Sequence, residues 1–381
     1  MRARQTRTRN LNRPKQRKTN TVAKARERGP SGLLVVNKPA GMTSHDVVSK
    51  IRWIAGTRRV GHAGTLDPAA TGVLVLGLNK ATKLLTYLVG QDKTYEARLV
   101  LGAATLTEDA EGELTGIARA EAVRALTREK IENAVRSLTG DIMQVPSAVS
   151  AIKVKGVRSY ARVRDGEDIE LPARKVTIHE AAIHEVRDSK LDTRLYTVAE
   201  GLDIPACVPV VEVDITVSCS SGTYIRAFAR DVGKALGVGG HLSALNRIRV
   251  GNVYQREALD LAELMKEREN ADGPLDLPVL SLEEAARRLF NVRQLTTQEA
   301  TDISFGRRIT VSEEGSDVLA LDTQSPESQH ANTEGITAAF APDGTLVALI
   351  ENVKFRGTRC AAPVLVFEAG IDFSREAGER L

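Results

Sequence analysis

The order of the strand-forming segments constrains the fold of this chain more than any other feature of its sequence. Two short apolar runs, LLVV at 33–36 and VLVL at 73–76, are typical of buried strands, and residues 94–101 and 211–217 alternate between apolar and polar as strands with one buried face do. Parallel strands need long crossovers, which are usually helical, and several of these strands follow one another without one. The order therefore predicts an α+β fold built on a mixed or antiparallel sheet rather than a doubly wound fold.

Short helices are expected between some of the strands. Their apolar residues recur at helical spacing, and residues that can cap or end a helix stand near their ends. Ser44 is expected to cap the first helix, which ends before Gly56, and Thr127 is expected to cap the second, which ends before Gly140. A third helix is expected after residues 219–222, and its inward-facing residues are Ile225, Phe228, Ala229, Val232 and Leu236.

The composition is that of an ordinary soluble globular protein. Apolar residues make up 42% and charged residues 27% of the 381 positions, and no apolar run approaches the roughly 20 residues that span a bilayer. The N-terminal region lacks the apolar stretch of a secretory signal. The three cysteines and six histidines show no paired framework and no metal-ligand spacing. We therefore expect a cytoplasmic protein without a membrane segment, a bound metal or a disulfide framework.

Charge is distributed unevenly along the chain. Residues 1–28 hold eleven Lys or Arg and one acid, a balance of +10, whereas the remaining chain has a balance of −6. The segment has almost no apolar residues, so residues 1–31 are expected to form a disordered basic leader. A leader of this charge is suited to binding a polyanion such as nucleic acid. An organellar transit peptide is a weaker alternative, because the segment has no clear apolar helical face.

The length allows two domains. A boundary is expected near 251–278, where Pro274 and Pro278 bracket a loop. Residues 32–250 would then form the larger domain and residues 251–381 a small β-rich domain.

Three local patterns describe this second domain. Capping boxes at 281–284 and 296–299 predict the starts of two short helices. The Pro-Asp-Gly sequence at 342–344 lies between apolar runs and predicts a hairpin. The polar segment 311–335 is expected to be a flexible insertion.

The chemistry is indicated by motifs rather than by a nucleotide-binding signature. The glycine-rich run GHAGTLDPAATG at 61–72 matches neither the P-loop nor the dinucleotide-binding pattern. It contains Asp67, and a lone Asp-Pro is most often a turn residue that accepts backbone N–H bonds. Here, however, the run is followed by DKTYEA at 92–97, by a cationic segment at 151–164 and by SCSSGTYIR at 218–226.

This ordered set of motifs resembles the TruB family of tRNA pseudouridine synthases. The resemblance covers residues 32–250, and the remainder looks like the small RNA-binding, PUA-like domain that follows the catalytic domain in that family. It implies isomerisation of the uridine at position 55 in the T-loop of tRNA: the N1–C1′ bond breaks, the uracil turns, and a C5–C1′ bond forms. No redox change or energy input is needed, so no cofactor is implied. The implied partner is the T-arm of tRNA, and we expect the enzyme to be a monomer.

The resemblance also implies a role for the principal motif residues. Asp67 is the catalytic carboxylate, and Arg226 is the partner that keeps it ionised, since an opposite charge within about 4–6 Å lowers a carboxyl pKa by roughly 1–3 units. The target uridine must be flipped out of the folded T-loop. Tyr95 stacks on the flipped base, and its hydroxyl is the implied proton acceptor from C5. Whether Asp67 attacks the base or the sugar, or assists elimination, is left open by the sequence.

Further residues are implied to bind the RNA. His62 supports the RNA where the base has left, Tyr224 lines the pocket, and Leu245 closes it. Five basic residues without a neighbouring acid are expected to meet tRNA phosphates, although a solvated face is the simpler alternative. They are Lys153, Lys155, Arg158, Arg162 and Arg164.

Two other functions fit the same RNA-binding surface. One is a tRNA-binding folding chaperone whose catalysis is incidental, and the other is a synthase that acts on ribosomal or messenger RNA. Substitution of Asp67 by Asn separates the chaperone from the enzyme, because it should abolish isomerisation and leave binding intact. Mapping of pseudouridine by position separates the different RNA substrates.

Overall fold

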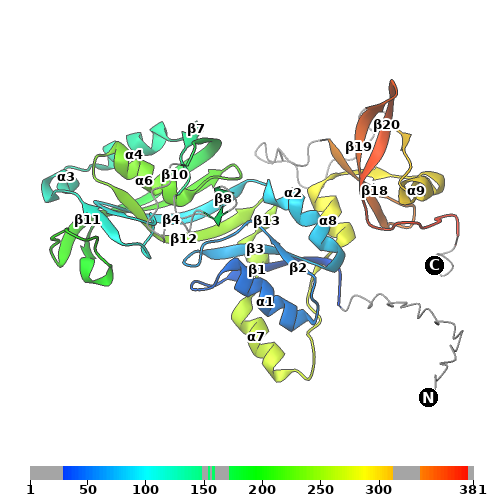
Figure 1. Ribbon diagram of the computed structural model, residues 1–381, viewed down its shortest axis with the longest axis horizontal. Coiled ribbons are helices and arrows are strands. Elements are labelled where there is room, and N and C mark those ends of the chain that lie inside the picture. The colour runs from blue at the N-terminus through cyan, green and yellow to red at the C-terminus, as the bar shows by residue number, and fades with distance from the viewer. Residues whose placement is uncertain (1–28, 148–152, 155–156, 159–170, 312–334, 376–381) are drawn as a thin grey trace, which may run out of the picture.

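The computed structural model describes residues 29–147, 153–154, 157–158, 171–311 and 335–375. Two sheets dominate this part of the chain (Figure 1). The larger sheet occupies the centre and left of the view, and the smaller sheet, formed by the C-terminal strands, lies at the upper right. The basic segment 1–28 and residues 312–334 of the expected insertion lie outside the described residues.

The larger sheet is mixed, which confirms the α+β class that the sequence predicted. Its eleven described strands are β1 (Gly32–Lys38), β2 (Val60–Ala63), β3 (Thr71–Leu78), β4 (Lys93–Leu101), β7 (Gly140–Gln144), β10 (Arg174–Asp192), β11 (Cys207–Cys219), β12 (Gly240–Val250), β13 (Val253–Tyr254), β14 (Leu259–Asp260) and β15 (Leu280–Ser281). The order along its main path is β14-β1-β3-β12-β4-β11-β10-β7. β12 runs parallel to β3 and β14 runs parallel to β1, whereas β4 lies antiparallel between β12 and β11.

Two pairs of helices pack on this sheet (Figure 1). α1 (Ser44–Ala55) and α7 (Leu261–Asn270) share an apolar core with β1 and β3, and α4 (Arg128–Ser137) and α6 (Ile225–Ala235) share another with β4 and β11. The connecting elements are η1 (Asn79–Leu84), α2 (Leu85–Val89), β5 (Ala103–Thr105), β6 (Leu114–Ile117), α3 (Ala120–Arg124), η2 (Thr193–Leu195) and η3 (Gln255–Glu257). Within the described ranges, no helix is long and apolar enough to cross a membrane.

The cap of α1 differs from the expected one. Thr43, not Ser44, is the N-cap residue: its hydroxyl accepts a hydrogen bond from the Asp46 amide, and the Asp46 carboxylate accepts one from the Thr43 amide. Ser44 is buried, and its hydroxyl bonds to both the amide and the carbonyl of Leu66. The expected cap residue therefore ties α1 to the loop that carries Asp67. The other two expectations are confirmed, because Thr127 caps α4 and the expected third helix is α6, which buries Ile225 and Phe228.

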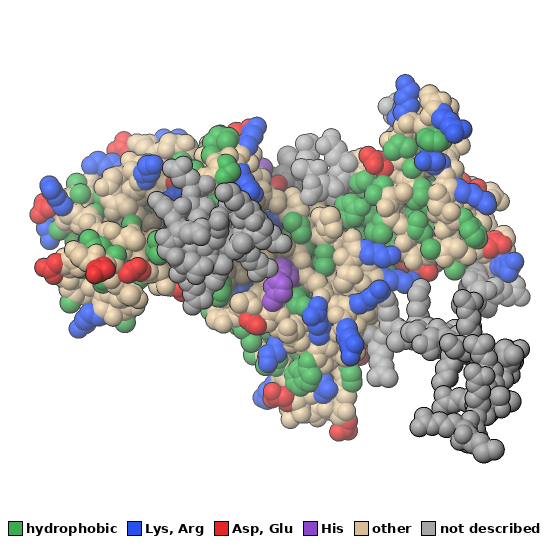
Figure 2. Space-filling model, viewed as in Figure 1, with side chains coloured by type: hydrophobic (Ala, Val, Ile, Leu, Met, Phe, Trp, Pro, Cys, Tyr) green, Lys and Arg blue, Asp and Glu red, His purple; other side chains and the backbone are tan. Residues whose placement is uncertain are grey.

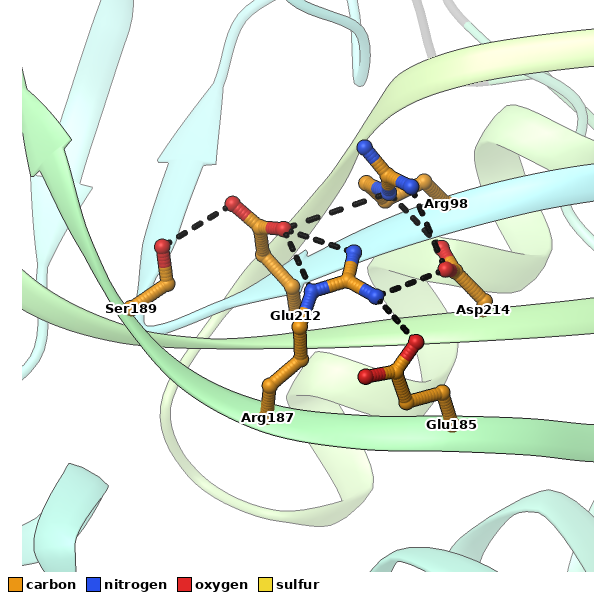
Figure 3. A network of polar contacts seen from close by, with 6 residues as sticks. All are labelled: Arg98, Glu185, Arg187, Ser189, Glu212 and Asp214. Carbon is orange, nitrogen blue, oxygen red and sulfur yellow. Dashed lines mark hydrogen bonds and ion pairs between the residues drawn. The ribbon is translucent and has the colours of Figure 1, made fainter.

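A network of ion pairs covers neighbouring positions of β4, β10 and β11 (Figure 3). Arg98 and Arg187 both donate to the Asp214 carboxylate, over distances of 2.7–3.1 Å. Arg187 also binds Glu185 and Glu212. The bonds from Arg98 lower the pKa of the Asp214 carboxyl to about 2. Opposite charges on adjacent strands thus stabilise the pairing of the three strands.

The smaller sheet is formed by the C-terminal part of the chain. Its strands are β16 (Asn291–Gln294), β17 (Ile309–Thr310), β18 (Ile336–Phe340), β19 (Leu346–Phe355) and β20 (Thr358–Val366), in the order β16-β18-β19-β20-β17. α8 (Leu282–Leu289) and α9 (Thr297–Ser304) begin at the two predicted capping boxes. The predicted hairpin at 342–344 joins β18 to β19.

The larger sheet continues beyond the position where the sequence suggested a boundary. β13, β14 and β15 fall within residues 253–281 and pair with β12 and β1. A shared apolar core, which includes Val75 of β3 and Phe340 of β18, joins the two sheets, and Lys80 of η1 forms an ion pair with Glu368. The sequence did not reveal this continuation, because strands of two residues are too short to show a pattern. The division of the chain into residues 32–250 and 251–381 stays a prediction.

Candidate active site

A cavity of about 320 Å³ opens where five segments of the larger sheet and its helices meet. These segments are the loop between β2 and β3, the end of α2, the start of β4, the N-terminal end of α6 and the middle of β12. Five residues that the sequence analysis selected line this cavity: Asp67, Tyr95, Tyr224, Arg226 and Leu245. The fold therefore brings together side chains from motifs that are far apart in the sequence. Figure 2 shows one face of the molecule with its side chains coloured by type.

The loop that carries Asp67 is held from several sides. Gly64 begins it with a φ of 82°, in the left-handed region that favours glycine. The buried Lys38 ammonium donates to the carbonyl of the residue that follows Asp67, at 3.0 Å. Ser44 holds Leu66 through both of its backbone groups. The carboxylate is thus presented by a well-supported backbone, as a catalytic group requires.

Asp67 and Arg226 form the ion pair at the centre of the site. The Arg226 guanidinium donates to both carboxylate oxygens, at 2.9 and 3.3 Å. Its other donors bind the Thr107 carbonyl at 2.7 Å and the Ser147 hydroxyl at 3.2 Å. The Arg226 side chain is 6% exposed, whereas that of Asp67 is 39% exposed. A buried, fully engaged guanidinium therefore orients a carboxylate that remains open to a ligand in the cavity.

Tyr95 and Tyr224 supply aromatic walls. Tyr95, on β4, is 7% exposed, and burial raises the pKa of its phenol while the charge of the nearby Arg247 opposes that rise. Tyr224 is the N-cap residue of α6, and its backbone N–H and carbonyl both bond to the side-chain amide of Gln144, at 2.9 and 3.1 Å. Together with Leu245, the two tyrosines line the cavity. Aromatic rings are side chains on which a flipped base can stack.

His62 lies beside the cavity rather than in its lining. It belongs to β2, just before the loop that carries Asp67. Its ring meets that of His45 edge-on, with 5.4 Å between the centroids. Burial, together with the nearby His45, lowers the pKa of the His62 imidazole. Its role in supporting the RNA stays a prediction.

Comparison with known proteins identifies the family. The profile of the TruB family pseudouridylate synthase N-terminal domain matches residues 52–225, and that of the tRNA pseudouridylate synthase B C-terminal domain matches residues 226–287. The tRNA pseudouridine synthase B of Arthrobacter sp. (strain FB24) is 50% identical over 88% of this chain and 96% of its own length. The chain belongs to the TruB family. The tRNA pseudouridine synthase B of Streptomyces coelicolor is 47% identical over 85% of this chain and 94% of its own length.

Solved structures agree with the TruB fold. A chain in the crystal structure of a Cbf5-Nop10-Gar1 complex aligns with a TM-score of 0.56, over 90% of this chain and 86% of that chain. Another, in an H/ACA RNP bound to a substrate RNA containing 2′-deoxyuridine, aligns with a TM-score of 0.55 over the same shares. Both are 21% identical in sequence, so they support the fold alone.

Asp109 is a residue of this TruB site that sequence reasoning missed. Its carboxylate lies 3.6 Å from the Arg226 guanidinium, and its side chain is 14% exposed. Arg226 therefore stands between two carboxylates, those of Asp67 and Asp109. Asp109 lies in the loop between β5 and β6, where the run TEDAEG at 107–112 shows no pattern that marks a site. Only the folded arrangement reveals the contact.

The cationic segment can be placed only in part. Lys153 and Arg158 are paired opposite each other in the short hairpin of β8 (Lys153–Val154) and β9 (Val157–Arg158). Lys155, Arg162 and Arg164 lie outside the described residues. The expected phosphate contacts of all five basic residues therefore stay predictions. As for metals, the described residues hold no group of three or more His, Cys, Asp or Glu side chains arranged to bind one.

Proposed function

We propose that this chain isomerises uridine 55, in the T-loop of tRNA, to pseudouridine. The observation that carries the proposal is the Asp67 carboxylate, held by the buried Arg226 at a cavity with two tyrosine walls. The relatives named tRNA pseudouridine synthase B, which match nearly the whole chain, support tRNA as the substrate. We further propose that the enzyme engages the T-arm as a monomer in the cytoplasm.

The geometry of the cavity supports the following sequence of events. A uridine within the folded T-loop reaches Asp67 only after it is flipped out of its stack. Stacking on Tyr95 and Tyr224 then offsets part of the cost, at roughly 1–3 kcal/mol per base. Arg226 holds the Asp67 carboxylate toward the nucleoside while the N1–C1′ bond breaks. After the uracil turns and the C5–C1′ bond forms, the Tyr95 hydroxyl takes the proton from C5 as its own proton leaves toward N1, the ring nitrogen that the broken bond left without one.

The test is to incubate the protein with an unmodified tRNA transcript and to map pseudouridine by position. We expect modification at position 55 and none in a matched transcript that carries cytidine there. Modification of ribosomal or messenger RNA fragments, with unmodified tRNA left unchanged, would favour the alternative substrates. Tight tRNA binding and faster annealing without pseudouridine would favour the chaperone.

A further inference from the structure

The floor of the cavity carries two buried cations that take no part in the proposed steps. Arg247 on β12 is 1% exposed, Lys93 at the start of β4 is 6% exposed, and both line the cavity. The Arg247 guanidinium donates to backbone carbonyls of the loop and strand around Asp67, at 2.9–3.4 Å. Lys93 donates to the carbonyls of Val89 and Gln91, which leaves one of its three N–H donors without a partner among the described residues.

Among the described residues, the buried charges of Arg247 and Lys93 have no carboxylate partner, so a counter-charge would stabilise them. Placing an isolated charge in a protein interior is costly unless it is paired. Backbone carbonyls satisfy hydrogen bonds of Arg247 and Lys93 but carry no net charge. An anion that occupies the cavity would complete this arrangement.

The two cations lie together beneath the loop that carries Asp67 and beside Tyr95. A Cβ atom built on Gly64 would lie 3.5 Å from Nη1 of Arg247 and 3.9 Å from Cε of Lys93. Arg247 is directly opposite Tyr95 in the antiparallel pair of β12 and β4, so the two side chains share one face of the sheet. Lys93 is two residues before Tyr95 on β4 and therefore points to the same face.

We propose that Arg247 and Lys93 bind and stabilise the uracil ring as an anion after it has left the ribose. This inference rests on the proposed function. When the N1–C1′ bond breaks, its electron pair stays with the uracil, and the positive charge that develops at C1′ faces the Asp67 carboxylate. The C5–C1′ bond then forms from an electron pair of the ring, and the proton lost from C5 is balanced by a proton gained at N1. Fixed, buried charges are well suited to hold the ring while it turns.

Because Lys93 must be charged for this role, the rate of the reaction should depend on pH. Burial, reinforced by the charge of Arg247, lowers the pKa of the Lys93 ammonium to about 8. The other groups that act on it are Asp92, which precedes it, and Cys219 on β11, whose thiol pKa is raised by burial to about 12 and which therefore stays neutral. Lys93 is thus charged at neutral pH and loses its charge as the pH rises through about 8.

The test compares Lys93→Arg, which keeps a charge that does not titrate, with Lys93→Met, which removes the charge. Single-turnover rates at saturating enzyme are measured from pH 6 to 9.5, with the Kd for tRNA measured alongside. We expect the wild-type rate to fall above pH 8 and the Lys93→Arg rate to be maintained there. The Lys93→Met rate should be about 10²–10³-fold lower at pH 7, with tRNA affinity little changed. Lys175→Met, which removes an exposed lysine of β10, is the matched control and should behave as wild type.

A binding measurement tests the inference without turnover. The probe is 5-nitrouracil, a uracil whose ring is acidic enough to be an anion at neutral pH, compared with neutral uracil. Wild-type protein should bind the anionic ring at least about tenfold more tightly, a difference of about 1.4 kcal/mol, and Lys93→Met should lose that preference. Equal affinity for the two rings, or a Lys93→Met variant with the wild-type rate and pH profile, would overturn the inference. Failure of the wild-type protein to form any pseudouridine would instead overturn the proposed function.

Discussion

Replacement of Arg226 by Lys tests whether the shape of the guanidinium, rather than its charge, positions Asp67. Lysine keeps the positive charge but has no planar fork. Arg226 donates to both oxygens of Asp67, to the Thr107 carbonyl and to the Ser147 hydroxyl. An ammonium group has three donors on one atom and cannot reach three groups that surround a planar fork, so at least one of these four bonds should be absent from the variant.

The structure sets the expected magnitudes. A hydrogen bond contributes about 1 kcal/mol and a buried polar group left unpaired costs about 1–3 kcal/mol, so Arg226→Lys should lower the free energy of unfolding by about 2–3 kcal/mol. The rate should suffer more, because displacement of a catalytic group by about 1 Å costs on the order of 10²-fold. We expect a single-turnover rate at least that much lower, with little change in the Kd for tRNA.

Arg230→Lys is the matched control. Arg230 lies one turn further along α6 and binds Glu108 and the Val145 carbonyl, and none of its described contacts involves Asp67. It should lose a similar amount of stability in denaturant titrations and keep a near-normal single-turnover rate. A near-normal rate for Arg226→Lys, or equal losses of rate in both variants, would refute the claim that the planar guanidinium of Arg226 positions Asp67.

Three further predictions concern single features of the chain. Tyr95→Phe keeps the stacking ring, so turnover should fall by about 10²–10⁴-fold with tRNA affinity retained; a normal rate would exclude the hydroxyl as proton acceptor. Deletion of residues 1–28 removes a charge of +10 and should flatten the dependence of log affinity on log salt by about 0.7–0.9 for each phosphate that the leader neutralises, whereas an unchanged slope would exclude the leader from RNA binding. Because the folded pKa of Asp214 is lowered from 3.8 to about 2, its stabilisation is present above pH 3.8 and is lost as the pH falls through 2. Asp214→Asn should therefore unfold more easily than wild type at pH 7, by about 1 kcal/mol, and the difference should vanish at pH 2; a constant difference would contradict the assignment.

Strands with one buried face could be predicted from the sequence, and strands without one could not. The alternation at 94–101 predicted β4, whose observed bounds are Lys93–Leu101, because burial of one face imposes a period of two. β10 is the longest described strand, yet it showed no such pattern. Many of its residues are exposed or half-buried, and two of its charged residues, Glu185 and Arg187, join the network with β11.

The motifs predicted the residues that line the cavity but not the residues that support them. Asp67, Tyr95 and Arg226 stand in runs whose type and order are specific. Asp109 reaches the same site from a segment without such a run, through a contact with Arg226, which is distant in the sequence. Arg247 lies two residues after Leu245, and its place opposite Tyr95 depends on the pairing of β12 with β4. A pattern that is local in the sequence cannot reveal a contact of this kind.

The most direct test of the central account is the single-turnover rate of pseudouridine formation by Asp67→Asn protein on a tRNA transcript. Asp67 lies in a loop with 39% of its side chain exposed, so the substitution should leave the fold and tRNA binding intact. The account predicts no pseudouridine at position 55 above background, together with the wild-type Kd for tRNA. A variant that binds tRNA normally and keeps more than a few per cent of the wild-type rate would contradict it.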